Sequence, residues 1–434
     1  MGTDLDLSAR RIAAARKSIA ANAVLTPVID ADWVGSRVGA TVKFKAECLQ
    51  RTGSFKVRGV SVRLGGARER FGPGGVVAAS AGNHARALAY VAARAGIPCQ
   101  IFMPSTASVS KIEAVRALGA SLALRDESVD GCLEHAHEYA DANDATLVHP
   151  FDDADVVLGQ ATLGAELLEQ IPEMRTVVLP VGGGGLAGGV AAALKQADPT
   201  IRIVGVQSEL CAPIADPERP VADLRFALAD GIAVKRPGAL TGPLIERYVD
   251  ELCTVDEDAI AEAIVALMQH GKLVVEGAGA VPVAALLSGI IEVDESEVVV
   301  AVLSGGNIDL DRLSAASRLH ESGQGTTIHF ATKVPDHPGG LAELLVAIAE
   351  GQGNVLSIEH VREAGQRGFH ETGVEILLQT RGVEHREELL ESLAGLGYEI
   401  VPLTPDRGAE GRERPEPPGG SVRHESSSAD SRRS

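Results

Sequence analysis

The chain has 434 residues, 45% of them hydrophobic, which is enough for more than one domain with a sizeable core. Its formal net charge of -19 at pH 7 argues against nucleic acid and anionic membranes as partners. The cysteines at positions 48, 99, 132, 211 and 253 form no C-x-x-C pair, and no apolar run is long enough for a membrane span, so we expect a cytoplasmic protein.

Apolar β-branched segments alternate with Ala-rich helical segments through most of the chain. The predicted strands include GGVVAAS, CQIFMP, TVVLPV, RIVGVQ and EVVVAVLSGG, and the predicted helices include NHARALAYVAARAG, SKIEAVRALGA and LAGGVAAALKQ. Strands separated by helices of this length indicate βαβ units and a parallel sheet. We therefore predict a large α/β domain over residues 1–318.

A different pattern begins near Thr326. TTIHFATKV alternates polar and apolar residues as a half-buried strand does, and helix, strand, strand, helix and strand segments follow it up to Leu403. This order is βαββαβ, a ferredoxin-like unit, which we place at residues 326–404 after a linker at 319–325. Residues 405–434 are poor in apolar side chains and predict a disordered tail.

A glycine-rich loop, VLPVGGGGLAGGV, lies between a predicted strand and a predicted helix. Backbone N–H groups at a helix start bind phosphate, so this loop predicts a phosphate site. Gly183, Gly185 and Gly188, with Glu209 further on, also fit the G-x-G-x-x-G pattern of nicotinamide dinucleotide enzymes. A tight turn without a ligand remains a third interpretation.

The segment RTGSFKVRG, residues 51–59, places Lys56 on a short stretch flanked by turns. Taken alone, a lysine is most often a solvated side chain, here on a strand edge. An amine and a phosphate-binding loop in one chain are, however, the two groups that pyridoxal phosphate requires, one for its aldehyde and one for its phosphate.

Several motifs in this chain resemble one family. RTGSFKVRG, SAGNHA, HPFDD, GGGGL, EGAGA and LSGGN, in this order, are similar to the fold type II, or tryptophan synthase β-like, pyridoxal phosphate enzymes, and within them to the threonine dehydratases. The C-terminal unit, with VPDHPGGLAELL at its first turn, resembles an ACT regulatory domain.

The resemblance implies a fold with two open parallel-sheet subdomains and pyridoxal 5'-phosphate as the cofactor. It implies β-elimination of L-threonine to 2-oxobutanoate and ammonia, with side activity on L-serine. It also implies a homo-oligomer, a dimer or tetramer, with an amino-acid effector at the ACT unit. An L-serine dehydratase or serine racemase of the same fold, a nicotinamide oxidoreductase and a non-catalytic amino-acid sensor remain alternatives.

The resemblance also assigns roles by motif position. Lys56 would bind the cofactor covalently and remove the α-proton of the substrate, and Phe55 would flank the cofactor ring. Asn83 would bind the phenolic oxygen of the cofactor. The phosphate would bind at Gly182, Gly183, Gly184, Gly185 and Leu186. The substrate carboxylate would bind at Ser80, Ala81, Gly82, Asn83 and His84.

Three assigned residues, Gly231, Glu276 and His84, have ordinary structural alternatives. Gly231 and Glu276 would line the cofactor pocket, although a tight turn and a buried helix cap explain them nearly as well. His84 taken alone is more often a structural histidine, and we give it no acid–base role. Ser304 would face the pyridine nitrogen of the cofactor, where a hydroxyl leaves the nitrogen uncharged and favours β-elimination over transamination or decarboxylation.

Ala81 bears on the choice between elimination and racemisation. Serine racemases have a second serine at this position of the loop, whereas here Ser80 is followed by alanine, which cannot transfer a proton. After RIVGV, Gln207 and Ser208 occupy the place where cation-binding members have an acidic residue, so we predict no metal site. A potassium site that includes Glu209 remains an alternative.

The ACT-like turn suggests an effector site. The segment DHPGGLAELL changes from strand to helix through two glycines and leaves helix N-terminal N–H groups for a carboxylate. We place the effector at Gly339, Gly340, Leu341 and Asn354, the last of which begins the next strand and is expected to lie close to this turn. We expect the effector to bind at the edge of the unit, between two chains. A domain that only dimerises would begin its helix in the same way.

Overall fold

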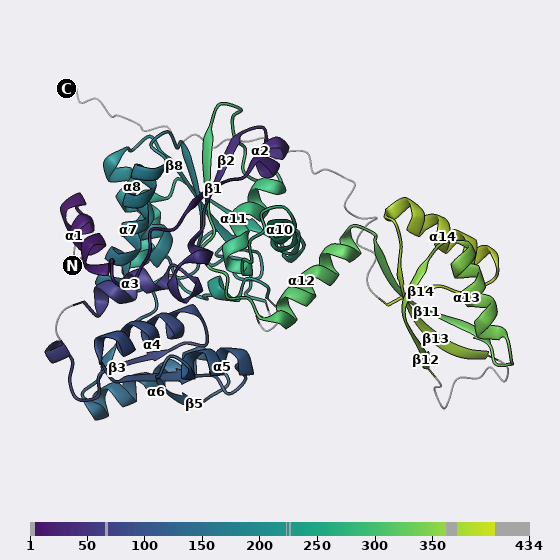
Figure 1. Cartoon of the computed structure of the whole chain (residues 1–434), viewed down its shortest axis with the longest axis horizontal. Coiled ribbons are helices and arrows are strands. Elements are labelled where there is room, and N and C mark those ends of the chain that lie inside the picture. Colours follow the sequence, from purple (N-terminus) through teal and green to yellow (C-terminus); the bar gives the residue numbers. More distant parts are fainter. Residues whose placement is uncertain (1–4, 66–67, 223, 225–226, 362–370, 404–434) are drawn as a thin grey trace, which may run out of the picture. The chain divides into compact units, whose positions relative to one another are not determined.

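The computed structural model describes residues 5–65, 68–222, 224, 227–361 and 371–403, and its cartoon is shown in Figure 1. The chain divides into two compact units, Met1–His320 and Glu321–Ser434. The segment predicted as a linker, 319–325, is mostly helical, because helix α12 extends over Leu310–Gly323. The predicted tail, 405–434, lies outside the described residues. In the described part of the chain, every helix is too short or too polar to cross a bilayer.

The larger sheet of the first unit has six strands in the order β1-β2-β10-β7-β8-β9. Strand β1 pairs antiparallel to β2, and the other neighbours are parallel. The strands are β1 (Val28–Asp30), β2 (Thr41–Lys45), β7 (Thr176–Pro180), β8 (Arg202–Ser208), β9 (Glu251–Val255) and β10 (Val298–Val302).

Helices cover both faces of this sheet (Figure 1). Val177 and Leu179 of β7 belong to a core with α7 (Ala154–Gln170) and α8 (Gly185–Ala197). Val178, between them, belongs to the core of the opposite face. The helices of that face are α2 (Asp32–Val38), α10 (Glu257–Gln269) and α11 (Gly277–Leu287). Burial on both faces explains why these strands are continuous apolar runs in the sequence.

A second, smaller sheet is inserted between β2 and β7. Its four parallel strands lie in the order β5-β4-β3-β6. They are β3 (Val76–Ala79), β4 (Cys99–Met103), β5 (Ser121–Leu124) and β6 (Thr146–Leu147), and their helices are α4 (Asn83–Ala95), α5 (Val109–Arg116) and α6 (Val129–Asn143). The prediction of two open parallel-sheet subdomains is confirmed.

Three further helices complete the described helices of the first unit before α12. They are α1 (Ala9–Ile19), α3 (Lys56–Arg63) and α9 (Thr241–Tyr248). Helix α3 follows β2 of the larger sheet after two short 3-10 helices and leads into the smaller sheet, so the segment that carries Lys56 joins the two subdomains. Helix α7 makes the return connection.

The second unit confirms the predicted βαββαβ order. Its antiparallel sheet has the strand order β12-β13-β11-β14. The elements are β11 (Thr327–Pro335), α13 (Gly340–Glu350), β12 (Asn354–Val361), β13 (Glu371–Gln379), α14 (Val383–Gly395) and β14 (Val401–Pro402). Phe330 and Ile376 pair across the sheet and are fully buried in a core with Leu344 of α13 and Leu389 of α14.

Candidate active site

Lys56 is the first residue of helix α3 and does not lie on a strand edge. Its side chain is half-buried, its Nζ donates a hydrogen bond to Pro150 O at 2.9 Å, and the same atom lies 5.1 Å from the centroid of the Phe55 ring. Burial lowers the pKa of Lys56 to about 8, although the Glu276 carboxylate opposes this change. An appreciable fraction of this amine is therefore neutral near neutral pH and able to act as a nucleophile or base.

The loop before Lys56 is fixed against the segment that follows β10. Phe55 N donates to Ser304 O at 3.1 Å, and Gly306 N donates to Gly53 O at 2.9 Å. Gly53 has a φ of 77°, a left-handed conformation that glycine adopts without strain. The buried Ser304 thus lies beside the Lys56 loop, as its predicted role requires.

Asn83 and Glu276 contact each other directly. Asn83, the first residue of α4, donates from Nδ2 to Glu276 Oε1 at 2.6 Å. Glu276 stands at the start of α11 but its side chain makes no capping bond there, so the helix-cap interpretation is wrong. Burial, and next the charge of Asp230, raise the pKa of Glu276 to about 7.

Asn307 orients the amide of Asn83. Its Nδ2 donates to Asn83 Oδ1 at 2.6 Å and to Thr52 O at 2.7 Å, and its Oδ1 accepts from Arg86 Nη1 at 2.8 Å. Because the carbonyl oxygen of Asn83 is occupied in this way, its amide group is held with the N–H donors toward Glu276. Asn307 and Arg86 were not predicted as site residues.

The glycine loop follows β7 and begins helix α8. Gly184 has a φ of 91°, and a Cβ on Gly183 would lie 2.4 Å from the Phe151 ring. Side chains are therefore excluded at both positions. The first N–H groups of α8 have no intrahelical acceptors, and the positive end of the helix dipole adds to their attraction for an anion.

The contacts among these residues close into a ring. Phe151, which packs on Gly183, follows the Pro150 that accepts the Lys56 hydrogen bond. On the other side of the loop, a Cβ on Gly182 would lie 3.0 Å from Ile232, and one on Gly231 would lie 3.7 Å from Glu276 Oε1. Glu276 is bonded to Asn83, Asn83 to Asn307, and Asn307 to Thr52 O of the Lys56 loop. The predicted cofactor residues therefore surround one place, at the carboxyl ends of β3, β7 and β10, where ligands bind in parallel α/β sheets.

The predicted carboxylate loop, residues 80–84, lies after β3. Gly82 N donates to Ser80 Oγ at 3.2 Å, and a Cβ on Gly82 would meet no atom within 4 Å, so this turn borders open space. His84 is buried, and its Nε2 lies 2.8 Å from Val148 O. Burial, and next the charge of Lys56, lower the pKa of His84 to about 3, so the imidazole is neutral. This arrangement is that of a structural histidine.

Four residues of the ring were missed by sequence reasoning: Pro150, Phe151, Arg86 and Asn307. Three of them belong to the motifs HPFDD and LSGGN, which were recognised without a role for these positions. An asparagine directly after a strand and two glycines was the available signal for Asn307, because such a side chain lies at the ligand-binding edge of a parallel sheet.

The predicted effector residues do not lie together in one chain. Gly339 and Gly340 follow Pro335, at the end of β11 that pairs with Glu371. Asn354 pairs with Gln379, which pairs with Thr327 at the opposite end of β11. The expectation that Asn354 lies close to the glycine turn within one chain is wrong, because α13 carries the chain back along the sheet before β12 begins.

Comparison with known proteins now decides the family. Residues 20–305 match the family model described as pyridoxal-phosphate dependent enzyme. The chain belongs to this family. The L-threonine ammonia-lyase of Geobacter sulfurreducens is 40% identical to this pyridoxal-phosphate dependent enzyme over 379 residues, which cover 86% of this chain and 94% of that relative.

Two solved structures are also similar. Maize serine racemase is 33% identical, with a TM-score of 0.66, and the match covers 74% of this chain and 98% of that one. The processed form of threonine deaminase isoform 2 from Solanum lycopersicum is 31% identical, with a TM-score of 0.66 and coverage of 74% and 90%.

The residues of the site fit pyridoxal phosphate, the cofactor of the family. Lys56 offers an amine, the glycine loop offers a helix N-terminus, and Asn83 offers a fixed carboxamide. Among the described residues, Thr52 Oγ1 and Ser54 Oγ, on the Lys56 loop, are buried without a hydrogen-bond partner. Buried hydroxyl groups of this kind ordinarily have partners, so these two are suited to a polar ligand.

Proposed function

We propose that this pyridoxal-phosphate dependent enzyme is a threonine ammonia-lyase, which converts L-threonine to 2-oxobutanoate and ammonia, with L-serine as a lesser substrate. The observation that carries the proposal is the ring of contacts around Lys56, in which an amine of lowered pKa, bonded to Pro150 O and influenced by the charge of Glu276, is joined through these contacts to Asn83 and a glycine loop. The 40% identity with an L-threonine ammonia-lyase supports the substrate class.

The residues of this chain have distinct roles in the proposed reaction. Lys56 holds the cofactor and, as a neutral amine, takes the α-proton of the bound amino acid. The N–H groups of the loop at residues 80–84 bind the substrate carboxylate next to open space at Gly82. The cofactor, when bound, supplies electron withdrawal that stabilises negative charge at the α-carbon.

Four further parts of the site hold the cofactor. Asn83, oriented by Asn307, presents an N–H donor to it, and Phe55 flanks its ring. Ser304 would face the ring nitrogen of the cofactor and would offer it a neutral hydroxyl. Glu276 and Gly231 line the same side of the site. The phosphate of the cofactor would be bound by Gly182, Gly183, Gly184, Gly185 and Leu186.

Racemisation is the nearest competing reaction, since maize serine racemase is 33% identical to this chain. A racemase needs an acid–base group on each face of the α-carbon. Ala81 lies in the carboxylate loop and packs against the core of the smaller subdomain, and its methyl group can transfer no proton. We therefore propose elimination, without efficient racemisation.

A product assay tests this function. The purified holoenzyme is incubated separately with L-threonine and L-serine, and 2-oxobutanoate, pyruvate, ammonia and D-serine are measured. We expect kcat/KM to be higher for threonine, ammonia and oxo acid to form in equal amounts, and D-serine to form at a rate at least about 100-fold lower, the scale of one missing acid–base group. Efficient formation of D-serine would contradict the proposal.

The C-terminal unit is proposed to be an ACT-type regulatory domain of a cytoplasmic homo-oligomer. The 379 residues aligned with the Geobacter sulfurreducens relative exceed the 320 residues of the first unit, so that relative shares part of the second. Because Asn354 and the turn at Gly339, Gly340 and Leu341 lie at opposite ends of β11 in one chain, an effector site made of both requires two copies.

Deletion of residues 325–434 is expected to leave an active enzyme that no longer responds to effector. In the full chain, isoleucine or valine should change the substrate affinity, and substrate should change effector affinity by the same factor, since binding coupling is reciprocal. Initial rates with and without each amino acid, for both proteins, measure this. A truncated enzyme that responds as the full chain does would place the effector in the first unit.

A further inference from the structure

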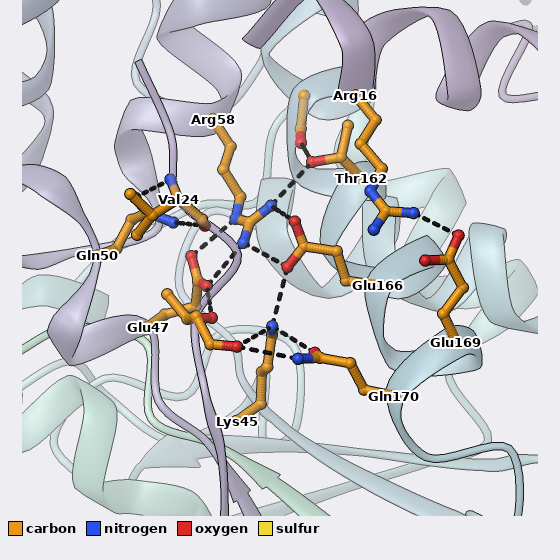
Figure 2. A network of polar contacts seen from close by, with 12 residues as sticks. Arg16, Val24, Lys45, Glu47, Gln50, Arg58, Thr162, Glu166, Glu169 and Gln170 are labelled. Carbon is orange, nitrogen blue, oxygen red and sulfur yellow. Dashed lines mark hydrogen bonds and ion pairs between the residues drawn. The ribbon is translucent and has the colours of Figure 1, made fainter. Parts of the chain in front are cut away.

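Four charged side chains contact one another where β2, the short helix after it, α3 and α7 meet (Figure 2). Lys45, Glu47 and Arg58 have no exposed surface, and Glu166 is only 4% exposed. Two cations and two carboxylates balance each other. We call these four side chains the buried charge network.

Arg58 is the centre of this network. Its Nε and Nη2 donate to the two carboxylate oxygens of Glu47, each at 2.8 Å. Its Nη1 and Nη2 donate to the two oxygens of Glu166 at 2.7 and 2.8 Å, and Nη1 also donates to Thr162 Oγ1 at 3.3 Å. The five N–H donors of the guanidinium group are all used, with two bidentate pairs, as Figure 2 shows.

Lys45 completes the network from strand β2. Its Nζ donates to Thr26 O at 3.0 Å, to Glu166 Oε2 at 2.9 Å and to Gln170 Oε1 at 2.7 Å. Burial raises the pKa of Glu166, but its bonds with Arg58 and Lys45 outweigh this effect and hold that pKa below its usual range. Lys45 contacts α7 and the N-terminal segment but makes none of its hydrogen bonds with α3.

Stability alone is a poor explanation for such a network. The desolvation of buried ions offsets most of their attraction, so well-packed apolar residues of similar volume are often as stabilising. What charge pairs with two bidentate contacts supply is a fixed relative geometry of the elements that they join. The question is therefore which elements Arg58 joins.

Arg58 joins the two segments that determine the position of the Lys56 amine. It lies two residues after Lys56 in α3, and its partner Glu47 lies in a short helix just before the Lys56 loop. Its other partner, Glu166, lies in α7, and α7 begins shortly after the Pro150 whose carbonyl accepts the Lys56 hydrogen bond.

Helices α3 and α7 also approach each other very closely. A Cβ on Gly159 would lie 2.4 Å from Gly59 Cα and 2.5 Å from Arg58 O, so the two backbones are in direct contact beside Arg58. Where two backbones are in direct contact, few side-chain atoms lie between them that could move to compensate for a shift of one helix. A change in the Arg58 pairs is therefore transmitted to the start of α3, where Lys56 lies.

We propose that Arg58 is a positioning residue, which, through Glu47 and Glu166, fixes the start of α3 relative to α7 and so places the Lys56 amine. The proposal rests on the role of Lys56 as the cofactor-binding lysine but not on the identity of the substrate. It distinguishes Arg58 from Lys45, which belongs to the same network but makes its hydrogen bonds with Thr26, Glu166 and Gln170 and not with α3.

Two holoenzyme variants test this separation. Arg58→Lys keeps the charge but loses both bidentate pairs, and Lys45→Met removes a buried charge from the same network as a matched control. The ratio of visible circular dichroism to absorbance of the bound cofactor reports how the cofactor is oriented, whatever substrate the enzyme uses. It is measured with kcat, KM and Tm.

We expect both variants to have a lower Tm, but only Arg58→Lys to change the spectroscopic ratio. Its kcat should fall about 10- to 100-fold, the effect of a misplacement of about 1 Å, with KM nearly unchanged. Lys45→Met should keep the wild-type ratio and a kcat within about twofold of wild type, as expected for a residue that only stabilises. Equal ratios and equal kcat losses in the two variants would overturn the proposal.

If Arg58→Lys does not fold, Thr162→Val replaces it. This change keeps nearly the same volume and removes one of the five Arg58 hydrogen bonds. It should shift the spectroscopic ratio in the same direction by a smaller amount. A ratio in Thr162→Val equal to that of wild type would then overturn the positioning role, whereas failure of the wild-type enzyme to act on threonine would contradict only the proposed function.

Discussion

Lys56→Ala is expected to lower kcat by at least about 10⁴-fold and to remove the visible absorbance of the bound cofactor. In the role proposed for Lys56, the change removes both the covalent attachment of the cofactor and a general base, and a general base alone contributes about 10²- to 10⁴-fold. The fold should be retained, because the side chain is half-buried and its described hydrogen bond is a single one to Pro150 O.

Lys43→Ala is the matched control. Lys43 lies on β2 and pairs with the exposed Asp30 at 2.6 Å, away from the ring of contacts around Lys56. Its removal should leave kcat and the visible spectrum unchanged, since such pairs contribute at most about 1 kcal/mol to stability. Far-ultraviolet circular dichroism and Tm check the fold of both variants. Wild-type turnover with an intact visible band in Lys56→Ala would show that another lysine holds the cofactor.

The fold could be predicted from the sequence wherever an element has a strong periodic pattern. The apolar runs of β7, β8 and β10 and the alternating pattern of β11 identified those strands before the structure was known. Strand β6, with two residues, has no periodicity to detect, whereas the equally short β14 was predicted as the last strand of the βαββαβ unit. The separation of the parallel strands into two sheets came from the family resemblance, because periodicity does not say which strands pair.

The site was predictable as a set of motifs but not as a set of contacts. The lysine, the glycine loop and the asparagine of SAGNHA are found by residue type and spacing. The direction of a side chain cannot be found in this way. Glu276 has the sequence position of a helix cap, yet its side chain bonds to Asn83 from another subdomain. Asn354 was placed near the wrong end of its sheet for a related reason, since strand order and register are tertiary properties.

Ser304→Asp is expected to lower the rate of threonine elimination by about 100-fold or more, the scale of one wrongly placed charge in a preorganised site. Ser304 is 2% exposed, so an aspartate there would enter a buried site. The new carboxylate would favour a protonated ring nitrogen, which strengthens electron withdrawal and stabilises negative charge on the cofactor at the expense of β-elimination. Absorbance at longer wavelength during turnover should report this.

Glu276 makes the same substitution more disruptive. A Cβ on Gly305, the residue after Ser304, would lie 2.2 Å from Glu276 Oε1, so two carboxylates would share this region. Like charges raise each other's pKa, and burial and Asp230 already raise that of Glu276 to about 7. Ser304→Ala distinguishes the loss of the hydroxyl from the addition of a charge, because it removes the hydroxyl without adding a carboxylate. Its activity should fall much less than that of Ser304→Asp. If Ser304→Asp matched wild type in rate and spectrum, Ser304 could not face the ring nitrogen, since a carboxylate in contact with that nitrogen must change its protonation.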